Sequence, residues 1–366
     1  MRKIMVVGAG RVGSTIAAML AAAGDYEVTV ADPVPAALAA LPEQPRVRAQ
    51  TLDVREPAAF AAALQEHYAV LSAAPFHLTT TLAEAAVAAG VHYLDLTEDV
   101  ASTQRVKVLA GTARSALIPQ CGLAPGFASI VAADLCRRFD ALHSVRLRVG
   151  ALPQFPHNAL HYNLTWNTEG LINQYCEPCE AIVEGVRRPV PALEELETFS
   201  LDGVGYEAFN TSGGLGSLCE TLQGQVRSLN YKSIRYPGHA LLMKALLNDL
   251  RLRDRRAVLK DILETAIPVT LQDLVIVFVT VTGLRGGQLM QESYAHKVYA
   301  QPVNGTPRSA IQVTTAASAC AVLDLLANGR LPAEGLVRQE EIPLPEFLSN
   351  RFGCVYAGPA AGRAAP

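Results

Sequence analysis

The sequence predicts an α/β fold in which a doubly wound parallel sheet carries an inserted α+β domain. A short apolar run, a glycine-rich turn and an Ala-rich helix follow one another between residues 4 and 23. Strand-length apolar runs then alternate with helix-length stretches as far as residue 120, which is typical of a parallel sheet covered on both faces. From about residue 143 the chain is richer in glycine, aromatic and β-branched residues, which indicates a second, mixed domain.

The first turn has the order of a dinucleotide-binding fingerprint. An apolar strand at 4–7 runs directly into G-x-G-x-x-G, and a helical stretch follows as far as Ala23. The first glycine allows a tight turn, the second lets backbone approach a pyrophosphate, and the third lets the helix pack close to the strand. Free N–H groups at the helix N-terminus suit the phosphates. The candidate cofactor residues here are Gly8, Gly10, Arg11, Val12 and Gly13. The alternative is a glycine-rich turn in an ordinary α/β protein.

An acidic residue ends the second predicted strand. Asp32 follows the run at 27–31 and stands nineteen residues after Gly13. A carboxylate there can accept hydrogen bonds from both hydroxyls of an adenosine ribose and repels a 2′-phosphate. Because residues 33–37 contain no Lys or Arg, we expect NAD as the cofactor rather than NADP.

Two further cofactor candidates lie at strand ends. Asp53 ends the third strand, expected at 46–52, and Ala74–Pro75 closes the fourth, expected at 68–74. Ligands bind outside the carboxyl ends of strands in open α/β sheets, although Pro75 is also an ordinary way to begin a loop.

The remaining elements follow in order along the chain. We expect helices at 57–66, 78–89 and 100–114, and strands at 91–96 and 116–120. Pro57 suits the first turn of the first helix, and Gly90 suits the end of the second. In the second domain we expect strands at 145–150, 160–166 and 274–283, and then an Ala-rich amphipathic helix at 309–327.

These elements predict four segments. A Rossmann domain is expected at 1–124 and an α+β substrate and dimerisation domain at 125–305. A helical segment at 306–358 returns to the first domain, and a tail of Gly, Ala and Pro at 359–366 is expected to be disordered.

The composition excludes several classes of protein. The net charge is −3 and no basic cluster stands out, so we expect no binding to nucleic acid or membrane surfaces. No stretch looks apolar enough for a membrane span, and the opening residues are typical of a strand rather than of a signal peptide. Seven cysteines are expected to be free thiols in the cytoplasm. Cys176 and Cys179 lack the second ligand pair of a zinc site, so we expect no metal.

Polar side chains end the fifth and sixth predicted strands. Asp95 is followed by Glu98 and Asp99, and crowding of carboxylates raises the pKa of at least one, which suits a general base or a partner for a substrate ammonium. Alternatively, Glu98 or Asp99 caps the next helix. Gln120 and Cys121 end the sixth strand, and we expect them beside the substrate.

A second group of polar residues precedes an apolar helix in the second domain. Arg235 offers a bidentate fork to a carboxylate, with Tyr236 beside it. Lys232 supplies a second charge or, if desolvated, a base, and His239 assists. The alternative is a basic surface turn.

Taken together, six segments carry a resemblance to a known family. They are Val6–Gly10 with Gly13, Ala73–Pro75, Tyr93–Glu98, Cys121–Gly126, Gly213–Thr221 and Tyr231–His239. In this order they resemble the saccharopine dehydrogenase family over nearly the full length of the chain. The last two look most like its lysine 6-dehydrogenase branch. Reductases of the family that use NADP lack an acid at the position of Asp32, and Cys219 replaces a small or apolar residue.

The resemblance implies a homodimeric enzyme that oxidises an amine on a lysine-like amino acid with NAD(P). We therefore expect an NAD-dependent dehydrogenase acting on the side-chain amine of L-lysine or a similar amino acid. Two alternatives stay open. One is a saccharopine-type or carboxynorspermidine-type enzyme acting on a secondary amine, and the other is a non-catalytic NAD-binding protein.

Overall fold

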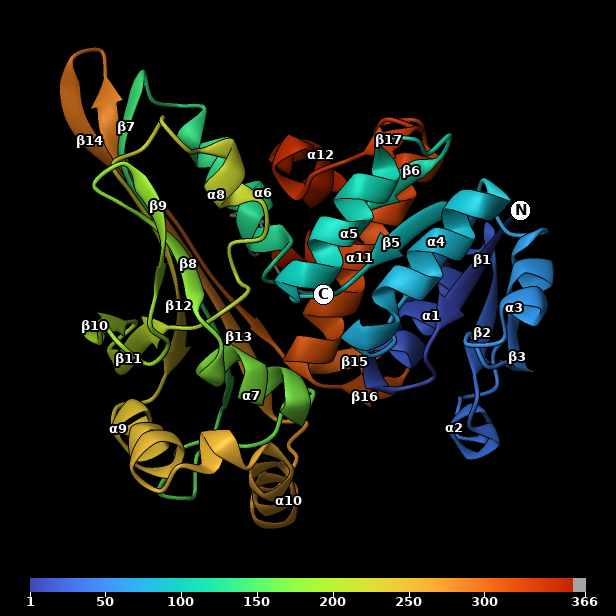
Figure 1. The fold of residues 1–366 in the computed structure, drawn as a ribbon, viewed down its shortest axis with the longest axis horizontal. Helices are drawn as coiled ribbons and strands as arrows, with labels where there is room; N and C mark the ends of the chain where they lie inside the picture. The colour runs from blue at the N-terminus through green and yellow to red at the C-terminus, as the bar shows by residue number, and fades with distance from the viewer. Residues whose placement is uncertain (358–366) are drawn as a thin grey trace, which may run out of the picture. The chain divides into compact units, whose positions relative to one another are not determined.

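The computed structural model of the chain describes residues 1–357 and divides into two compact units (Figure 1). The first comprises Met1–Phe127, Pro302–Arg308 and the described residues from Gln312 onward. The second comprises Ala128–Gln301 and Ser309–Ile311, so it is an insertion within the chain of the first. The tail predicted to be disordered, 359–366, lies outside the described residues.

A seven-stranded sheet forms the centre of the first unit, in the order β17-β6-β5-β4-β1-β2-β3. Its strands are β1 (Arg2–Val7), β2 (Tyr26–Asp32), β3 (Val47–Thr51), β4 (Ala69–Ser72), β5 (His92–Asp95), β6 (Ala116–Ile118) and β17 (Gly335–Leu336). Its helices are α1 (Arg11–Ala23), α2 (Pro35–Ala39), η1 (Phe76–Leu78), α3 (Pro57–Leu64), α4 (Thr79–Ala89), α5 (Val100–Ala110), α11 (Ala310–Ala327), η4 (Gln339–Glu341), α12 (Leu344–Ser349) and η5 (Gly353–Tyr356). The strands β15 (Gln301–Val303) and β16 (Thr306–Arg308) form a separate pair.

Every pairing in this sheet is parallel, as the sequence predicts. The reason is visible in β1, where Ile4, Met5 and Val6 are fully buried, because helices cover both faces of such a strand. The chain order reverses at β1, which has β2 on one side and β4 on the other. That reversal is the switch point at which open α/β sheets bind ligands, outside the carboxyl ends of the strands.

The helix α11 differs from its prediction. We expected an amphipathic helix, but nearly all of its residues are buried, and a helix apolar all round belongs in a core.

We also expected no stretch with the character of a membrane span. Within residues 1–357, α11 alone is long and apolar enough by length and composition, yet 89% of that window is buried inside the structure. The apolar character of α11 is therefore only weak evidence for a membrane span, and its burial is typical of the core helix of a folded domain.

The second unit is built on an eight-stranded mixed sheet with the main order β10-β11-β12-β7-β13-β14. Its strands are β7 (Ala141–Pro153), β8 (Cys179–Val183), β9 (Val186–Val190), β10 (Glu197–Leu201), β11 (Val204–Asn210), β12 (Ser228–Arg235), β13 (Asp273–Arg285) and β14 (Gln288–Tyr299). Its helices are α6 (Phe127–Cys136), α7 (Thr168–Cys176), α8 (Leu218–Thr221), α9 (His239–Lys244), the π-helical η2 (Ala245–Asp249), η3 (Leu252–Asp254) and α10 (Arg256–Ala266).

The strand predicted at 160–166 is wrong. Only an isolated bridge joins Leu164 to Val269. The Leu164 amide donates to the carbonyl of Pro268, and proline has no N–H with which to continue a ladder. Tyr162 and Leu164 still pack into a hydrophobic cluster of the second unit, so the apolar alternation in the sequence reflects burial without a sheet.

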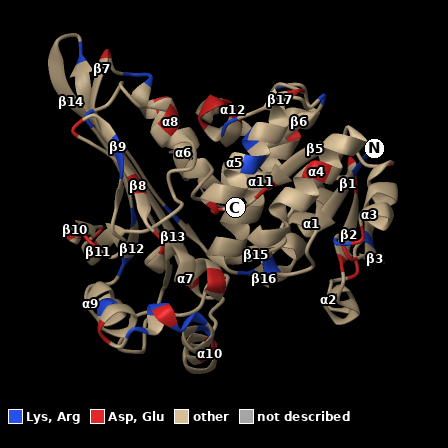
Figure 2. Ribbon diagram, viewed as in Figure 1, with Lys and Arg blue, Asp and Glu red and all other residues tan. Residues whose placement is uncertain are grey.

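Charged residues of both signs are interspersed along the ribbon (Figure 2). In that view, the Lys and Arg residues (blue) of the described chain are mixed with Asp and Glu residues (red) and are not gathered into one basic region. This mixture is in keeping with the net charge of −3.

Candidate active site

In the glycine turn, two glycines are in close contact with neighbouring backbone and a third faces open space. Gly8 has φ of 106°, and a Cβ there would lie 2.7 Å from the carbonyl oxygen of Ala73. A Cβ on Gly13 would collide with the carbonyl of Gly8. A Cβ on Gly10, by contrast, would meet no atom within 4 Å, so the space beside it is free for a ligand. No side chain caps the N-terminus of α1, which leaves its first N–H groups for a phosphate. These residues fit a dinucleotide.

Asp32 braces this turn from the end of β2. Its Oδ2 accepts a hydrogen bond from the Ala9 amide and its Oδ1 accepts one from the Val34 amide, both at 2.9 Å. A carboxylate has about four lone-pair sites, so it can still accept from a ribose. Asp53 behaves differently, because Arg55 binds it bidentately on the surface, with a closest N–O distance of 2.7 Å.

The predicted Ala74 and Pro75 follow β4 at the switch point. The Ala73 amide donates to the carbonyl of Val7, which ties this segment to the strand that leads into the glycine turn. Arg11 and Val12 begin α1 in the same turn, so most of the predicted cofactor residues lie at one edge of the sheet.

Asp95 lies at the carboxyl end of β5 and is 1% exposed. Its Oδ1 accepts hydrogen bonds from the amides of Thr97 and Gln120, at 3.0 and 2.8 Å. Its Oδ2 is buried and accepts none from the described residues. Burial dominates over the opposing effects of these two hydrogen bonds and of the Tyr93 hydroxyl, and raises the pKa of Asp95 to about 6. A buried carboxylate with a free oxygen and a raised pKa is a candidate proton acceptor.

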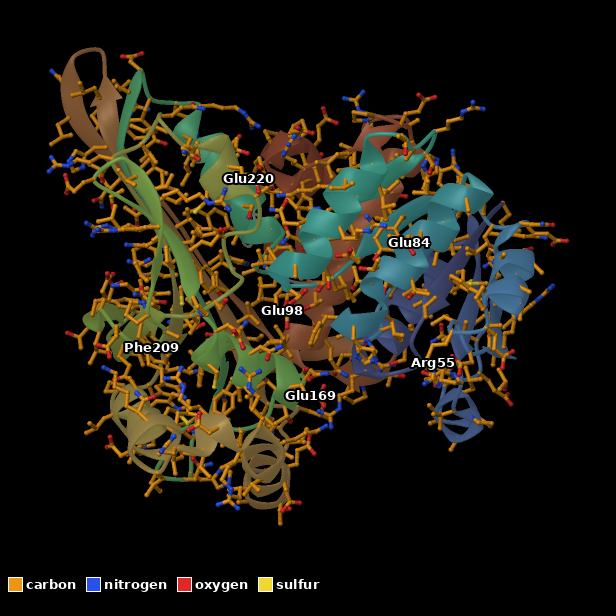
Figure 3. The ribbon with its side chains drawn as sticks, viewed as in Figure 1. Arg55, Glu84, Glu98, Glu169, Phe209 and Glu220 are labelled. Atoms are coloured by element: carbon orange, nitrogen blue, oxygen red, sulfur yellow. The ribbon has the colours of Figure 1, made fainter. Side chains whose placement is uncertain are left out.

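The structure separates the roles of Glu98 and Asp99, which the sequence left open. Asp99 caps α5, because its Oδ1 accepts from the Ser102 amide at 2.7 Å. Glu98, labelled in Figure 3, directly precedes this cap and is not the N-cap residue of α5. Burial, together with the charges of Asp99 and Asp95, raises its pKa.

Gln120 and Cys121 are held beside Asp95. Gln120 has a positive φ of 65°, and its side-chain amide donates to the Thr103 hydroxyl at 3.2 Å. Cys121 is fully buried, and burial raises the pKa of its thiol well above the usual value. It therefore stays a thiol at neutral pH, which agrees with a reaction that requires no covalent step.

Gln339 of η4 is a member of this group that the sequence did not reveal. Its Nε2 donates to the carbonyl of Pro119 at 2.9 Å and to Cys121 Sγ at 3.3 Å, and its buried Oε1 has no partner among residues 1–357. No motif surrounds it, and it lies more than two hundred residues from Cys121 in sequence, so no local signal marks it.

In the second unit, the four predicted residues do not form one cluster. Successive side chains of a strand point to opposite faces, and Lys232 and Arg235 both lie on β12, three residues apart. Lys232 bonds Glu197 at 3.1 Å, whereas Tyr236 packs on Tyr206 and donates to the carbonyl of Pro153 at 2.9 Å. Neither contacts Arg235. Nearness in sequence therefore does not bring all four side chains together.

Lys232 belongs to an ion-pair network. Glu197 bridges Lys232 and Arg148, and Arg148 also donates to Asn230 at 2.8 Å. Burial opposes ionisation of Glu197, but these two cations outweigh it and hold its pKa below the usual range. Because its ammonium is bound to Glu197, Lys232 stabilises the sheet.

Arg235 and His239 are brought together by a residue the sequence did not single out, Tyr175 of α7. Arg235 Nε donates to the Tyr175 hydroxyl at 2.9 Å, and that oxygen lies 3.0 Å from His239 Nε2. His239 Nδ1 lies 2.8 Å from the carbonyl of Leu160, which can only accept. The network therefore assigns the proton to Nδ1. Burial, and then the charge of Arg235, lower the pKa of His239 to about 3, so it is neutral at physiological pH and does not serve as a proton carrier.

Gly214 and two cysteines of the second unit are explained by packing and burial. A Cβ on Gly214 would collide with the ring of Tyr231, so that glycine of the Gly213–Gly216 turn is required by packing. Cys176 and Cys179 are buried free thiols. Among the described residues no group of His, Cys, Asp and Glu is arranged to hold a metal.

Family models match both parts of the chain. One, described as the saccharopine dehydrogenase NADP binding domain, matches residues 4–117, and another, described as the saccharopine dehydrogenase C-terminal domain, matches residues 122–352. The chain belongs to the saccharopine dehydrogenase family. Its first unit is thus an NAD(P)-binding domain, and the protein is an NAD(P)-dependent oxidoreductase.

Solved structures show the same fold. Saccharopine dehydrogenase (L-Glu forming) from Saccharomyces cerevisiae matches with a TM-score of 0.80 and 16% identity, covering 95% of this chain and 96% of that one. Homospermidine synthase from Legionella pneumophila, solved in complex with NAD, matches with a TM-score of 0.70 and 13% identity, covering 100% and 94%. The Rossmann and mixed-sheet architecture predicted for this member of the saccharopine dehydrogenase family is therefore confirmed.

Proposed function

We propose that this protein is an NAD-dependent dehydrogenase that oxidises the side-chain amine of L-lysine or a lysine-like amino acid. The observation that carries the proposal is the unpaired charge of Arg235. The buried cations among residues 1–357 are Arg148, Lys232 and Arg235. Arg148 and Lys232 share Glu197, but Arg235 hydrogen-bonds only to neutral oxygens.

A buried charge without a partner is costly, and a substrate carboxylate is the partner that a guanidinium fork fits. One such cation suits an amino acid with one carboxylate to anchor. In the first unit, the buried Oδ2 of Asp95 suits an ammonium or an amine proton.

The chemistry follows from these two groups. A primary ammonium must lose a proton before its carbon can give up hydride, and we assign that proton to Asp95. NAD, when bound, accepts the hydride. The substrate is left as an iminium ion, and water converts that ion to an aldehyde and ammonia. Arg235 holds the carboxylate of the amino-acid head through its guanidinium fork.

We infer NAD rather than NADP from Asp32, whose carboxylate faces the glycine turn and would repel a 2′-phosphate. We also infer a cytoplasmic homodimer. All seven cysteines are free thiols, which suits a reducing compartment. Among the described strands, β14 pairs only with β13, so its outer edge is available to a second copy. Sedimentation of the purified protein tests the dimer.

A secondary-amine substrate is the second candidate, because both matching family models carry the name of saccharopine dehydrogenase. The two reactions differ in their products. We would follow reduced nicotinamide by absorbance with NAD and L-lysine at alkaline pH and assay ammonia in parallel. Reduction with equal ammonia supports the lysine reaction. Reduction only with saccharopine, and no ammonia, supports the second candidate instead.

A further inference from the structure

The surroundings of Arg235 contain more than one group aimed at an anion. A guanidinium carries five N–H groups. Nε donates to Tyr175 and one Nη1 N–H donates to the carbonyl of Ile234 at 2.8 Å, so three have no acceptor among the described residues. The residue is only 3% exposed. Several donors are thus held in a largely dry place with nothing in the protein to receive them.

Tyr162 supplies another unpaired group at the same place. The Arg235 guanidinium carbon lies 5.1 Å from the centre of the Tyr162 ring. The hydroxyl of Tyr162 is buried and has no hydrogen-bond partner within residues 1–357. Buried hydroxyls are rarely left without partners, so this hydroxyl beside a guanidinium with spare N–H groups indicates a place for a further group that accepts hydrogen bonds.

The nearest buried carboxylate does not fill that role. Glu207 lies directly opposite Arg235 across the β11–β12 pair, so both side chains share one face. Its two oxygens accept instead from the amides of Gly238 and Ala240 at the start of α9, and it forms no ion pair with Arg235. Glu207 thus holds the helix that carries His239.

The direction of the guanidinium is fixed from behind. Tyr175 receives the Nε–H and stands 3.0 Å from His239 Nε2, which accepts the phenol proton because Nδ1 faces the Leu160 carbonyl. The Tyr175 ring centre also lies 5.8 Å from the guanidinium carbon. With Nε anchored and one Nη1 N–H on Ile234, the remaining fork has little freedom, which lowers the entropy cost of binding a planar anion.

We propose that Tyr162, Tyr175 and His239 complete Arg235 as a receptor for a single carboxylate, with Tyr162 donating a hydrogen bond to it and the Tyr175–His239 pair acting as positioning residues. The receptor rests on the proposed function, which gives Arg235 a substrate carboxylate. It adds the residues that complete the site around that carboxylate, and it assigns roles to Tyr162 and Tyr175 for the first time.

The test measures binding without turnover. L-norleucine has the amino-acid head and an apolar chain, and pentylamine is the same molecule without its carboxylate. We would titrate each into the full-length protein with NAD by calorimetry. Wild type should bind L-norleucine at least tenfold more tightly than pentylamine, because a hydrogen bond to a charged group is worth about 1.5–3 kcal/mol. Equal affinities would overturn the receptor.

The variants separate the three roles. Tyr162→Phe removes one oxygen and should weaken L-norleucine about tenfold while leaving pentylamine unchanged. Tyr175→Phe and His239→Phe should each reduce the preference for L-norleucine. His239→Gln, which restores an acceptor for the Tyr175 hydroxyl, should recover part of it, and a purely structural role for His239 would show no such recovery. The matched control is Tyr206→Phe, on the opposite face of the sheet, which should bind as wild type does.

Failures of the two proposals are distinguishable. If Arg235→Ala abolishes the preference but Tyr162→Phe and Tyr175→Phe retain it in full, the receptor is wrong and the assignment of Arg235 stands. If L-norleucine binds as expected but no amine is oxidised, the receptor stands and the proposed dehydrogenase is wrong.

Discussion

Replacing Asp95 with Asn should make the protein more stable at neutral pH while it abolishes turnover. Asn is close in size to Asp, and its Oδ1 can accept the same hydrogen bonds from the amides of Thr97 and Gln120. What the substitution removes is a negative charge on a side chain that is 1% exposed and whose Oδ2 has no partner among residues 1–357.

The size of the gain follows from the pKa. Burial raises the pKa of Asp95 from 3.8 to about 6, and each pKa unit is worth about 1.4 kcal/mol, so the charge costs about 3 kcal/mol. Between pH 4 and 6 the native state holds a proton that the unfolded state has lost. The free energy of unfolding of the wild type therefore falls as the pH rises through this range and is constant above it. The Asn variant has no such loss, so its stability relative to the wild type should rise by about 3 kcal/mol between pH 4 and pH 6, from a starting point set by the two N–H groups that it buries.

Urea unfolding followed by circular dichroism, at steps from pH 4 to pH 8, measures this difference. Asp99→Asn is the matched control. It removes a charge four residues away, and Asn is an equally good cap for α5, so no comparable gain in stability should develop. A variant Asp95→Asn that is no more stable than wild type at pH 7, or whose advantage is the same at pH 4, would refute the reasoning. Loss of reduced-nicotinamide formation in the same variant supports the proton-acceptor role.

Four further variants test the cofactor site, the two glycine turns at Gly214 and Gly10, and the ion-pair network around Glu197. Asp32→Ala should weaken NAD and narrow its advantage over NADP, since both the ribose acceptor and the brace on Ala9 are lost; unchanged dissociation constants by fluorescence titration would contradict this. Gly214→Ala should destabilise the protein by about 1–3 kcal/mol because its Cβ would strike Tyr231, whereas Gly10→Ala should fold normally and bind NAD poorly, as thermal melts with and without NAD would show. Glu197→Gln leaves Arg148 without an ion-pair partner among the described residues and Lys232 with only Glu195, 3.8 Å away, and should cost about 3 kcal/mol in urea unfolding, so a loss below 1 kcal/mol would argue against the network.

The glycine turn and the parallel sheet were predictable because their signals are local. Most strands there are apolar runs closed by a turn, and Gly8 and Gly13 are required by close contacts within the same unit. The carboxylates after β5 were predictable as a group for the same reason. Which of them caps α5 was not, because that depends on the backbone angles at Asp99.

The site in the second unit was only partly predictable. Arg235 stood out by residue type, but its separation from Lys232 depends on β12 being a strand. Tyr162 and Tyr175 look like ordinary aromatic residues until β12 brings Arg235 between them, sixty or more positions later in the chain. Gln339 reaches Cys121 only through the fold. Contacts of this kind leave no periodicity to find in a single sequence.

The discontinuous chain of the first unit has a consequence for how the protein is made. Residues 128–301 are contiguous and hold every member of the carboxylate receptor, so the inserted unit can complete itself while the ribosome is still translating. The first unit cannot, because α11, whose Val313 packs on Ala18, and the edge strand β17 are synthesised only after the inserted unit. We therefore expect the domain that begins the chain to be the last to close. Until then, the first six strands of the nucleotide-binding sheet lack their last partners. We therefore expect the nascent chain to depend most on chaperones after the inserted unit has folded.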